Sequence, residues 1–113
     1  MNLQKTEFQT TLPNGTAVVI DQVSVKKGIM RLKALHHKLR IAILKLLDEH
    51  GQMTVTEIFV KLRIEQSVAS QQLAILRNAE AVIAVRDGKF IHYSINPAQI
   101  DFINTAALNL LKK

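Results

Sequence analysis

The 113-residue sequence predicts a mainly α-helical fold of about five helices with one small β-hairpin of two strands. Two patterns support this prediction. Apolar residues recur at helical spacing in several segments between residues 22 and 111, and residues 82–95 form two β-branched and aromatic runs around Asp87-Gly88. At 48% hydrophobic, the chain can fill one modest core. We therefore expect a single domain over residues 21–113, preceded by an extension at residues 1–20.

The extension carries a turn signal, Pro13-Asn14-Gly15, between short apolar runs. This pattern is compatible with a short hairpin, a disordered arm or a lead-in to the first helix, and it does not select among them.

Two helical stripes follow the extension. The first spans residues 22–35 and the second runs from Leu39 to Leu47, with Gly51 as its stop. The pattern fits either two helices broken near His36-His37 or one continuous helix.

The next two helices are short and lie close together. Thr54 followed by Glu57 matches a capping box, which predicts a helix start at residue 55. A further helix, about Gln66 to Ala79, is amphipathic, although Glu65 before it is a weak cap. Its apolar face holds Ala69, Leu73 and Leu76. Its other face presents a row of small or polar side chains, namely Ser67, Ser70, Gln71, Ala74 and Asn78.

The C-terminal part of the sequence predicts a hairpin and a last helix. Residues 82–86 and 90–95 read as strands joined at Asp87-Gly88, because Gly tolerates the positive φ of a tight turn. Pro97 stands near the start of a helix over about 98–112. That helix is apolar almost all round and needs a partner surface. The order of elements predicts a winged helix-turn-helix, with the hairpin as its wing.

The composition narrows the classes of function. Fifteen Lys and Arg against nine Asp and Glu give a net charge of +6, which favours a polyanion such as DNA or RNA. The absence of cysteine excludes disulfides and thiolate metal sites. None of the four His has a His or carboxylate three or four residues further along, so we expect neither a metal site nor a cofactor. No catalytic motif and no membrane-length apolar run occur, so we expect a cytoplasmic protein that is not an enzyme.

Three stretches, residues 35–47, 66–77 and 82–95, together resemble the arsenic-repressor type (ArsR/SmtB) of winged-helix transcription factors. The resemblance covers roughly residues 25–112 and rests most on Ser-x-x-Ser-x-Gln-Leu-x-x-Leu-Arg followed by a Gly-turned wing. It implies a homodimer built from the first and last helices, with two copies of the polar-fronted helix in successive major grooves of a near-palindromic operator.

The sequence departs from the family at its metal sites. Positions that carry two cysteines in metal-sensing members correspond here to Thr54 and Thr56. Those of a second metal site correspond to Pro97, Gln99, Leu110 and Lys113, which are not metal ligands under ordinary conditions. The family's usual Asp-Pro before the second helix is replaced by His37-Lys38. The release signal, if there is one, therefore stays open.

We expect sequence-specific binding of double-stranded DNA by a homodimeric regulator, most simply a repressor. Gln71 is the first candidate for a contact to an adenine edge. The candidate DNA-binding residues are Gln66, Ser67, Ser70, Gln71, Arg77, Arg86, Lys89, Arg63 and Arg40. The candidate dimer residues are Val25, Ile29, Leu32, Ile100, Phe102, Ile103, Ala107, Leu110 and Leu111. The alternative is a winged-helix protein-interaction module that docks onto another protein through its apolar C-terminal helix.

Overall fold

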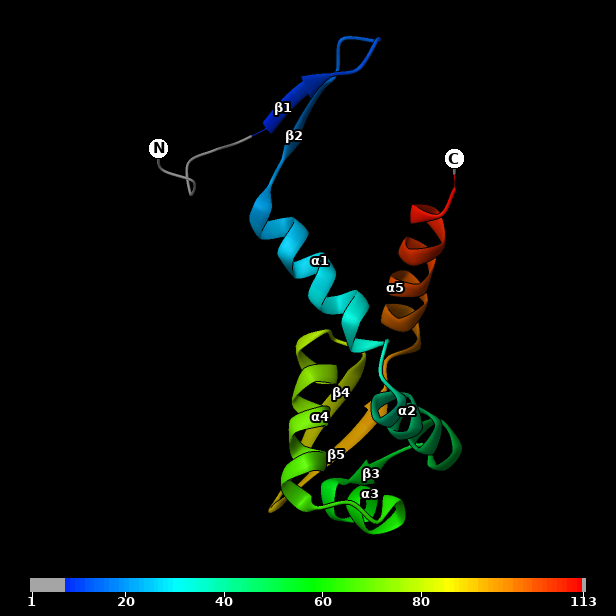
Figure 1. The fold of residues 1–113 in the computed structure, drawn as a ribbon. Coiled ribbons are helices and arrows are strands. Elements are labelled where there is room, and N and C mark those ends of the chain that lie inside the picture. The colour runs from blue at the N-terminus through cyan, green and yellow to red at the C-terminus, as the bar shows by residue number, and fades with distance from the viewer. Residues whose placement is uncertain (1–7, 113) are drawn as a thin grey trace.

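The computed structural model describes residues 8–112. Figure 1 shows a helical body at one end and a separate hairpin at the other. The elements in chain order are β1 (Phe8–Thr11), β2 (Ala17–Ile20), α1 (Gln22–Ala34), α2 (Lys38–His50), β3 (Met53–Thr54), α3 (Val55–Leu62), α4 (Gln66–Asn78), β4 (Val82–Asp87), β5 (Phe90–Ile95) and α5 (Pro97–Leu110). The predicted winged helix-turn-helix, with five helices and a two-stranded wing, is confirmed.

The two apolar stripes between residues 22 and 50 form two separate helices and not one continuous helix. α1 ends at Ala34, and α2 begins at Lys38 after His37, whose backbone is extended with φ of −163°. The His37 side chain caps α2, because its Nδ1 accepts a hydrogen bond of 3.1 Å from the Leu39 backbone N–H. An imidazole thus satisfies one of the free N–H groups at this helix start.

The capping box at the start of α3 is confirmed. The Glu57 backbone N–H donates to Thr54 Oγ1 at 3.3 Å, and Glu57 Oε1 accepts from the Thr54 backbone N–H at 3.0 Å. The Thr54 hydroxyl also donates to Glu57 Oε1. These hydrogen bonds favour the carboxylate form and lower the pKa of Glu57, and positive charge at His92 and His50 adds to the effect.

The sheet has one more strand than the sequence predicted. β3 pairs with β5, giving the antiparallel order β3-β5-β4. The wing is the β4–β5 hairpin, and its turn lies one residue later than predicted, since Asp87 pairs with Phe90 and Gly88-Lys89 form the loop. Of these two loop residues only Gly88 has a positive φ, +62°, which fits a type II′ turn with Gly in first position.

The core lies where α2, α3 and α4 meet the base of the wing. Its fully buried large side chains are Ile43, Leu47, Ile58, Leu73 and Leu76. α5 joins this body through Asn96, which caps the helix, donates from Nδ2 to the Glu80 carbonyl at 3.0 Å, and precedes Pro97 at the first helical position. Gln99 Nε2 donates to the Ala79 carbonyl at 3.0 Å, so the start of α5 is tied to the end of α4.

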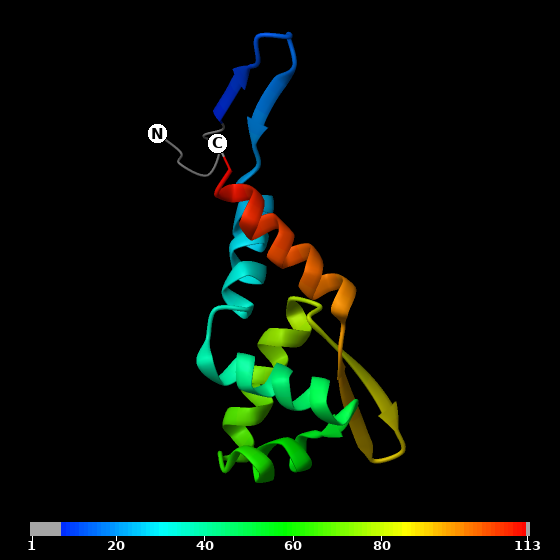
Figure 2. The ribbon, with the colours of Figure 1, turned by 90° about the vertical axis from the view of Figure 1, so that its right-hand side faces the viewer.

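Residues 8–20 form an antiparallel hairpin, which settles the choice left open for this part of the extension. We call this β1–β2 hairpin the arm. It continues into α1 through Asp21, which caps that helix by accepting from the Val23 backbone N–H and from the Ser24 hydroxyl. These hydrogen bonds lower the pKa of Asp21. Figures 1 and 2 both show the arm extending beyond the body at the end where α5 also terminates.

Candidate DNA-binding surface

The polar row of α4 faces outward along its whole length. We use this name for Ser67, Ser70, Gln71, Ala74 and Asn78, all of which are exposed. On the opposite face Ala69, Leu73 and Leu76 are at most 1% exposed. The predicted division of this helix into two faces is therefore confirmed, and the polar row itself carries only serine, alanine, glutamine and asparagine. Gln66, at the first turn, is also exposed.

The backbone turns sharply just before α4 and just after it. Arg63 ends α3 in the left-handed conformation, with φ of 55°, and three residues later α4 begins. Glu80 takes the same kind of conformation after α4, with φ of 62°. Glu65, at the N-cap of α4, makes no side-chain capping hydrogen bond to the described residues, as its weak capping ability predicted.

Arg40 is placed differently from the prediction. It is 8% exposed, so it lies inside the body and not on the exposed surface. Its Nε donates to the Ala34 carbonyl at 2.9 Å, Nη2 to the Lys33 carbonyl at 2.9 Å, and Nη1 to Gln72 Oε1 at 2.7 Å. The guanidinium thus satisfies two carbonyls at the C-terminal end of α1. It also binds the side chain of Gln72 on α4, which joins α2 to α4. We remove Arg40 from the candidate DNA contacts and assign it to the fold.

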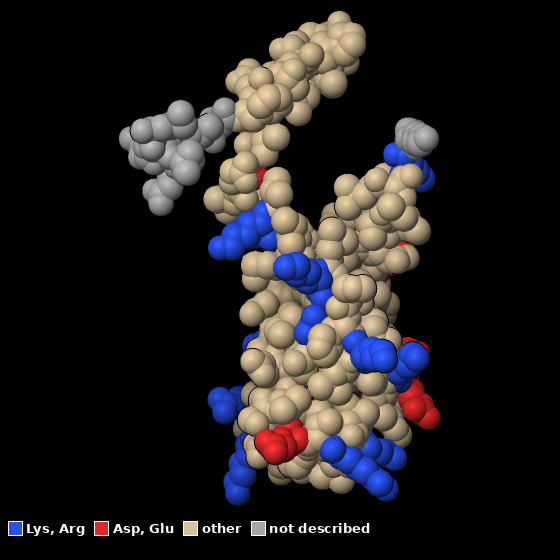
Figure 3. Space-filling view, viewed as in Figure 1, with Lys and Arg blue, Asp and Glu red and all other residues tan. Residues whose placement is uncertain are grey.

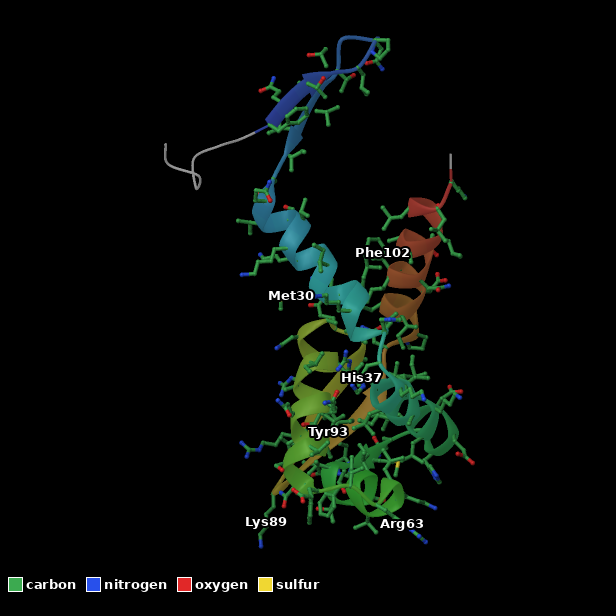
Figure 4. The ribbon with its side chains drawn as sticks, viewed as in Figure 1. Met30, His37, Arg63, Lys89, Tyr93 and Phe102 are labelled. Atoms are coloured by element: carbon green, nitrogen blue, oxygen red, sulfur yellow. The ribbon has the colours of Figure 1, made fainter. Side chains whose placement is uncertain are left out.

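The other predicted cations are exposed and lie on three different elements. Arg63 and Arg77 belong to the ends of α3 and α4, and Arg86 and Lys89 to the wing. Figure 4 shows Lys89 at the wing tip and Arg63 at the end of α3, on the two sides of the base of the molecule, where α4 begins. In Figure 3, Lys and Arg side chains are spread over the body, whereas the arm shows none. Two exposed acidic residues lie close to these cations in the sequence: Asp87 follows Arg86, and Glu65 comes two residues after Arg63.

The predicted dimer residues separate into three groups by their exposure. Val25, Ile29 and Phe102 are exposed at 46%, 46% and 65%, and Leu110 and Leu111 at 72% and 81%. Leu32, Ile100 and Ala107 are half-buried.

Ile103 differs from the rest of that set, because it is 3% exposed and already covered within the protomer. It lines a groove of about 270 Å³ between α1 and α5, together with Leu32, Phe102 and Leu110. Figure 4 shows Phe102 on the side of α5 that faces α1.

Three of the positions that the resemblance aligned with metal ligands have structural roles. Thr54 caps α3, Pro97 starts α5, and the Gln99 side chain binds the end of α4. Lys113 lies outside the described residues. Among residues 8–112 no group of three His, Asp or Glu is placed to bind a metal ion. No helix in this part of the chain is long and apolar enough to span a membrane.

Several bacterial regulators are similar to this protein over most of its sequence. Residues 37–83, which cover α2 through the first residues of β4, match the model of the family described as bacterial regulatory protein, arsR family. The transcriptional repressor PagR of Bacillus anthracis is 32% identical over 84 residues, which cover 74% of this chain and 84% of PagR. The regulator Rv0081 of Mycobacterium tuberculosis is 37% identical over 81 residues, which cover 72% of this chain and 71% of that protein.

Solved structures give the same result for the fold. The crystal structure of PagR aligns with a TM-score of 0.59 and 31% identity, covering 76% of this chain and 99% of that chain. The crystal structure of Rv0081 aligns with a TM-score of 0.60 and 35% identity, covering 80% of this chain and 91% of that chain. A domain from Mycobacterium bovis also shares the fold, with a TM-score of 0.64 and 24% identity. It is described as a homodimeric winged helix-turn-helix DNA-binding domain, and the alignment covers 84% of this chain and 90% of that domain. These relatives and this winged helix place the chain in the arsR family of bacterial DNA-binding transcriptional regulators.

Proposed function

We propose that this protein is a homodimeric repressor that binds a near-palindromic operator with one copy of α4 in each of two successive major grooves. The observation that supports this most directly is the polar row of α4, which is exposed along its whole length beside a basic wing. A face of small hydroxyl and amide side chains allows the helix backbone to approach the base edges closely. The protein would act in the cytoplasm, where bacterial DNA lies.

The residues of the polar row would have different roles. Gln71 carries an amide that can make paired contacts to N6 and N7 of adenine, so we assign it to base recognition. Ser67 and Ser70 have short hydroxyl side chains near the start of α4, which suit contacts to phosphates that fix the register of the helix. Gln66 belongs to the first turn, where free backbone N–H groups also favour a phosphate.

Cations on neighbouring elements would contact the DNA backbone on both sides of α4. Lys89 and Arg86 belong to the wing, and Arg63 ends the helix before α4. Each contact to a phosphate releases a counterion, so these residues would contribute affinity without sequence preference. Arg77, near the C-terminal end of α4, is a further candidate of this kind.

The dimer would form through α1 and α5. Large apolar side chains on both helices are exposed, and the groove between the two helices leaves room for side chains of a second copy. A two-fold axis near this surface would place the two α4 helices about 34 Å apart, one turn of DNA. PagR and the arsenical resistance operon repressor of Escherichia coli, both relatives of this chain, are named as repressors, which supports repression by occupancy of the operator.

The experiment that tests the proposal measures binding of the full chain to the DNA upstream of its own gene. Fluorescence anisotropy at one fixed salt concentration compares this duplex with a scrambled duplex of equal length. We expect the upstream duplex to bind at least about 1,000-fold more tightly. Equal affinity for the two duplexes would contradict the proposal. Light scattering provides the second measurement, because a monomer with an exposed α5 would favour the protein-interaction module instead.

A further inference from the structure

Residues 8–30 form the least covered segment of the described chain. Every one of them is exposed, including all eight residues of the arm's strands and the first part of α1. The Cα radius of gyration is 18.1 Å, with extents of 54 × 33 × 26 Å. A compact domain of this length has a radius of about 13 Å. The difference reflects an arm that extends away from the body (Figure 1).

An isolated two-stranded hairpin is at best marginally stable in water, so the arm needs further contacts. Its register separates two faces, because directly paired residues lie on the same side of a hairpin. Phe8 pairs with Ile20, and Thr10 pairs with Val18, which makes one face largely apolar. The other face holds Gln9, Thr11, Ala17 and Val19.

The C-terminal end of α5 is the apolar surface that matches the arm best. Leu108, Leu110 and Leu111 are exposed at 54%, 72% and 81%. Residues 8–20 contain no charged side chain, and Asp101 is the one charged residue of α5. Lys112 follows Leu111 directly, but its long side chain can keep its charge in water, so contact through the three leucines need bury no unpaired charge. Both surfaces also lie at the end of the molecule away from the wing (Figures 1 and 2).

We propose that the arm of each protomer packs its Phe8, Val18 and Ile20 face onto the C-terminal half of α5 of a second copy of this chain. Within one chain α1 and α5 diverge, so the arm and the end of α5 are apart (Figure 1). The arm continues directly from α1, which together with α5 forms the proposed dimer surface. In a two-fold dimer the exchange is reciprocal, and each arm covers the α5 of its partner. This inference rests on the proposed homodimer.

The first test compares two faces of the same strand. Val18→Thr with Ile20→Thr removes apolar surface from the face proposed to be buried, and Val19→Thr makes the same kind of change on the opposite face. Threonine keeps the β-branched shape, so the strand preference is retained. Sedimentation equilibrium should show the dimer dissociation constant raised about 100-fold by the double variant, because four side chains change per dimer. Val19→Thr should change it less than about 3-fold.

A second test identifies which chain the arm contacts and uses the absence of native cysteine. Val18→Cys and Leu110→Cys proteins are purified separately, mixed, and treated with a short bismaleimide. We expect a cross-linked product of dimer mass, and about ten times less of it when Val19→Cys replaces Val18→Cys. A chain that carries both Val18→Cys and Leu110→Cys and cross-links only within itself, at monomer mass, would overturn the proposal.

The outcomes separate this inference from the proposed function. If the double threonine variant and Val19→Thr dimerise equally well while the protein still binds its operator as a dimer, the arm exchange is wrong and the repressor proposal stands. If the unmodified protein is monomeric and shows no operator preference, the proposed function is wrong, and the arm exchange falls with it.

Discussion

Replacing the buried Arg40 should destabilise the fold strongly. We choose Arg40→Met, which keeps most of the side-chain volume and removes all of the hydrogen-bond donors. The change deletes bonds to the Ala34 and Lys33 carbonyls and to Gln72 Oε1, which measure 2.9, 2.9 and 2.7 Å. It also leaves these three acceptors without their present partner, the Ala34 carbonyl in a buried place and the other two in partly buried places.

The magnitude follows from these three bonds. A hydrogen bond to a charged group contributes about 1.5–3 kcal/mol, and three would give well over 4 kcal/mol if they added. The cost of desolvating the guanidinium disappears with the charge, and water can reach the partly buried Lys33 carbonyl, so both effects reduce the loss. We expect the free energy of unfolding to fall by about 3 kcal/mol, out of a typical total of 5–15 kcal/mol.

The assay is urea denaturation followed by circular dichroism, at one fixed protein concentration because a dimer's stability depends on it. With an m value of about 1.5 kcal/mol/M, the midpoint should fall by about 2 M. Arg86→Met on the exposed wing is the matched control and should change stability by less than about 0.5 kcal/mol. A loss below about 1 kcal/mol for Arg40→Met would refute the role assigned to this guanidinium.

The other predictions concern α4, its flanking turn, the wing and the α3 cap. Gln71→Ala should cost about 1–3 kcal/mol in binding free energy at one operator position and nothing on scrambled DNA, as measured with a set of single-base operator variants. Lys89→Ala should weaken binding to every duplex and reduce the slope of log affinity against log salt by about one; an unchanged slope would exclude a phosphate contact. Arg63→Gly should relieve the strain of the left-handed backbone at φ of 55° and leave the free energy of unfolding within about 1 kcal/mol of its present value. It should also weaken binding to all duplexes, and unchanged binding would remove Arg63 from the candidate DNA-binding residues. The lowered pKa of Glu57 means that its carboxylate stabilises the fold above the ordinary value of 4.5, and that this contribution is lost as the pH falls through the lowered pKa. Denaturation midpoints between pH 3 and 7 should therefore fall less steeply for Glu57→Gln, and parallel curves for the two proteins would contradict this assignment.

Local signals in the sequence predicted most of the elements. The Thr54 and Glu57 capping box, the two faces of α4 and the Gly88 turn each depend on residues within a few positions of one another, so their spacing is visible in the chain. β3 was missed because it has two residues, and its partners Tyr93 and His92 lie far along the sequence. No periodicity can be read from so short a strand.

The errors at the candidate site have a shared cause. Arg40 was predicted to contact DNA, whereas its hydrogen-bond acceptors come from the end of another helix and from Gln72, 32 residues further on. Ile103 was predicted to face a second copy because α5 is apolar almost all round, and the sequence does not say which side meets α1. In both cases the decisive contacts lie between elements that are distant in the sequence. A local sequence pattern does not show which neighbouring element a side chain will meet.

The exposure of residues 8–30 has a consequence for how this protein can be observed. Backbone amides that are protected from hydrogen exchange by tertiary packing report the stability of the unit that encloses them. Amides of α2, α3 and α4 should exchange slowly in any state of the protein, since a core encloses them, whereas those of the arm and the first turns of α1 can slow only when something covers them. If a dimer covers the arm as proposed, the deuterium uptake of one N-terminal peptide would therefore measure the fraction of assembled molecules without a covalently attached dye or tag.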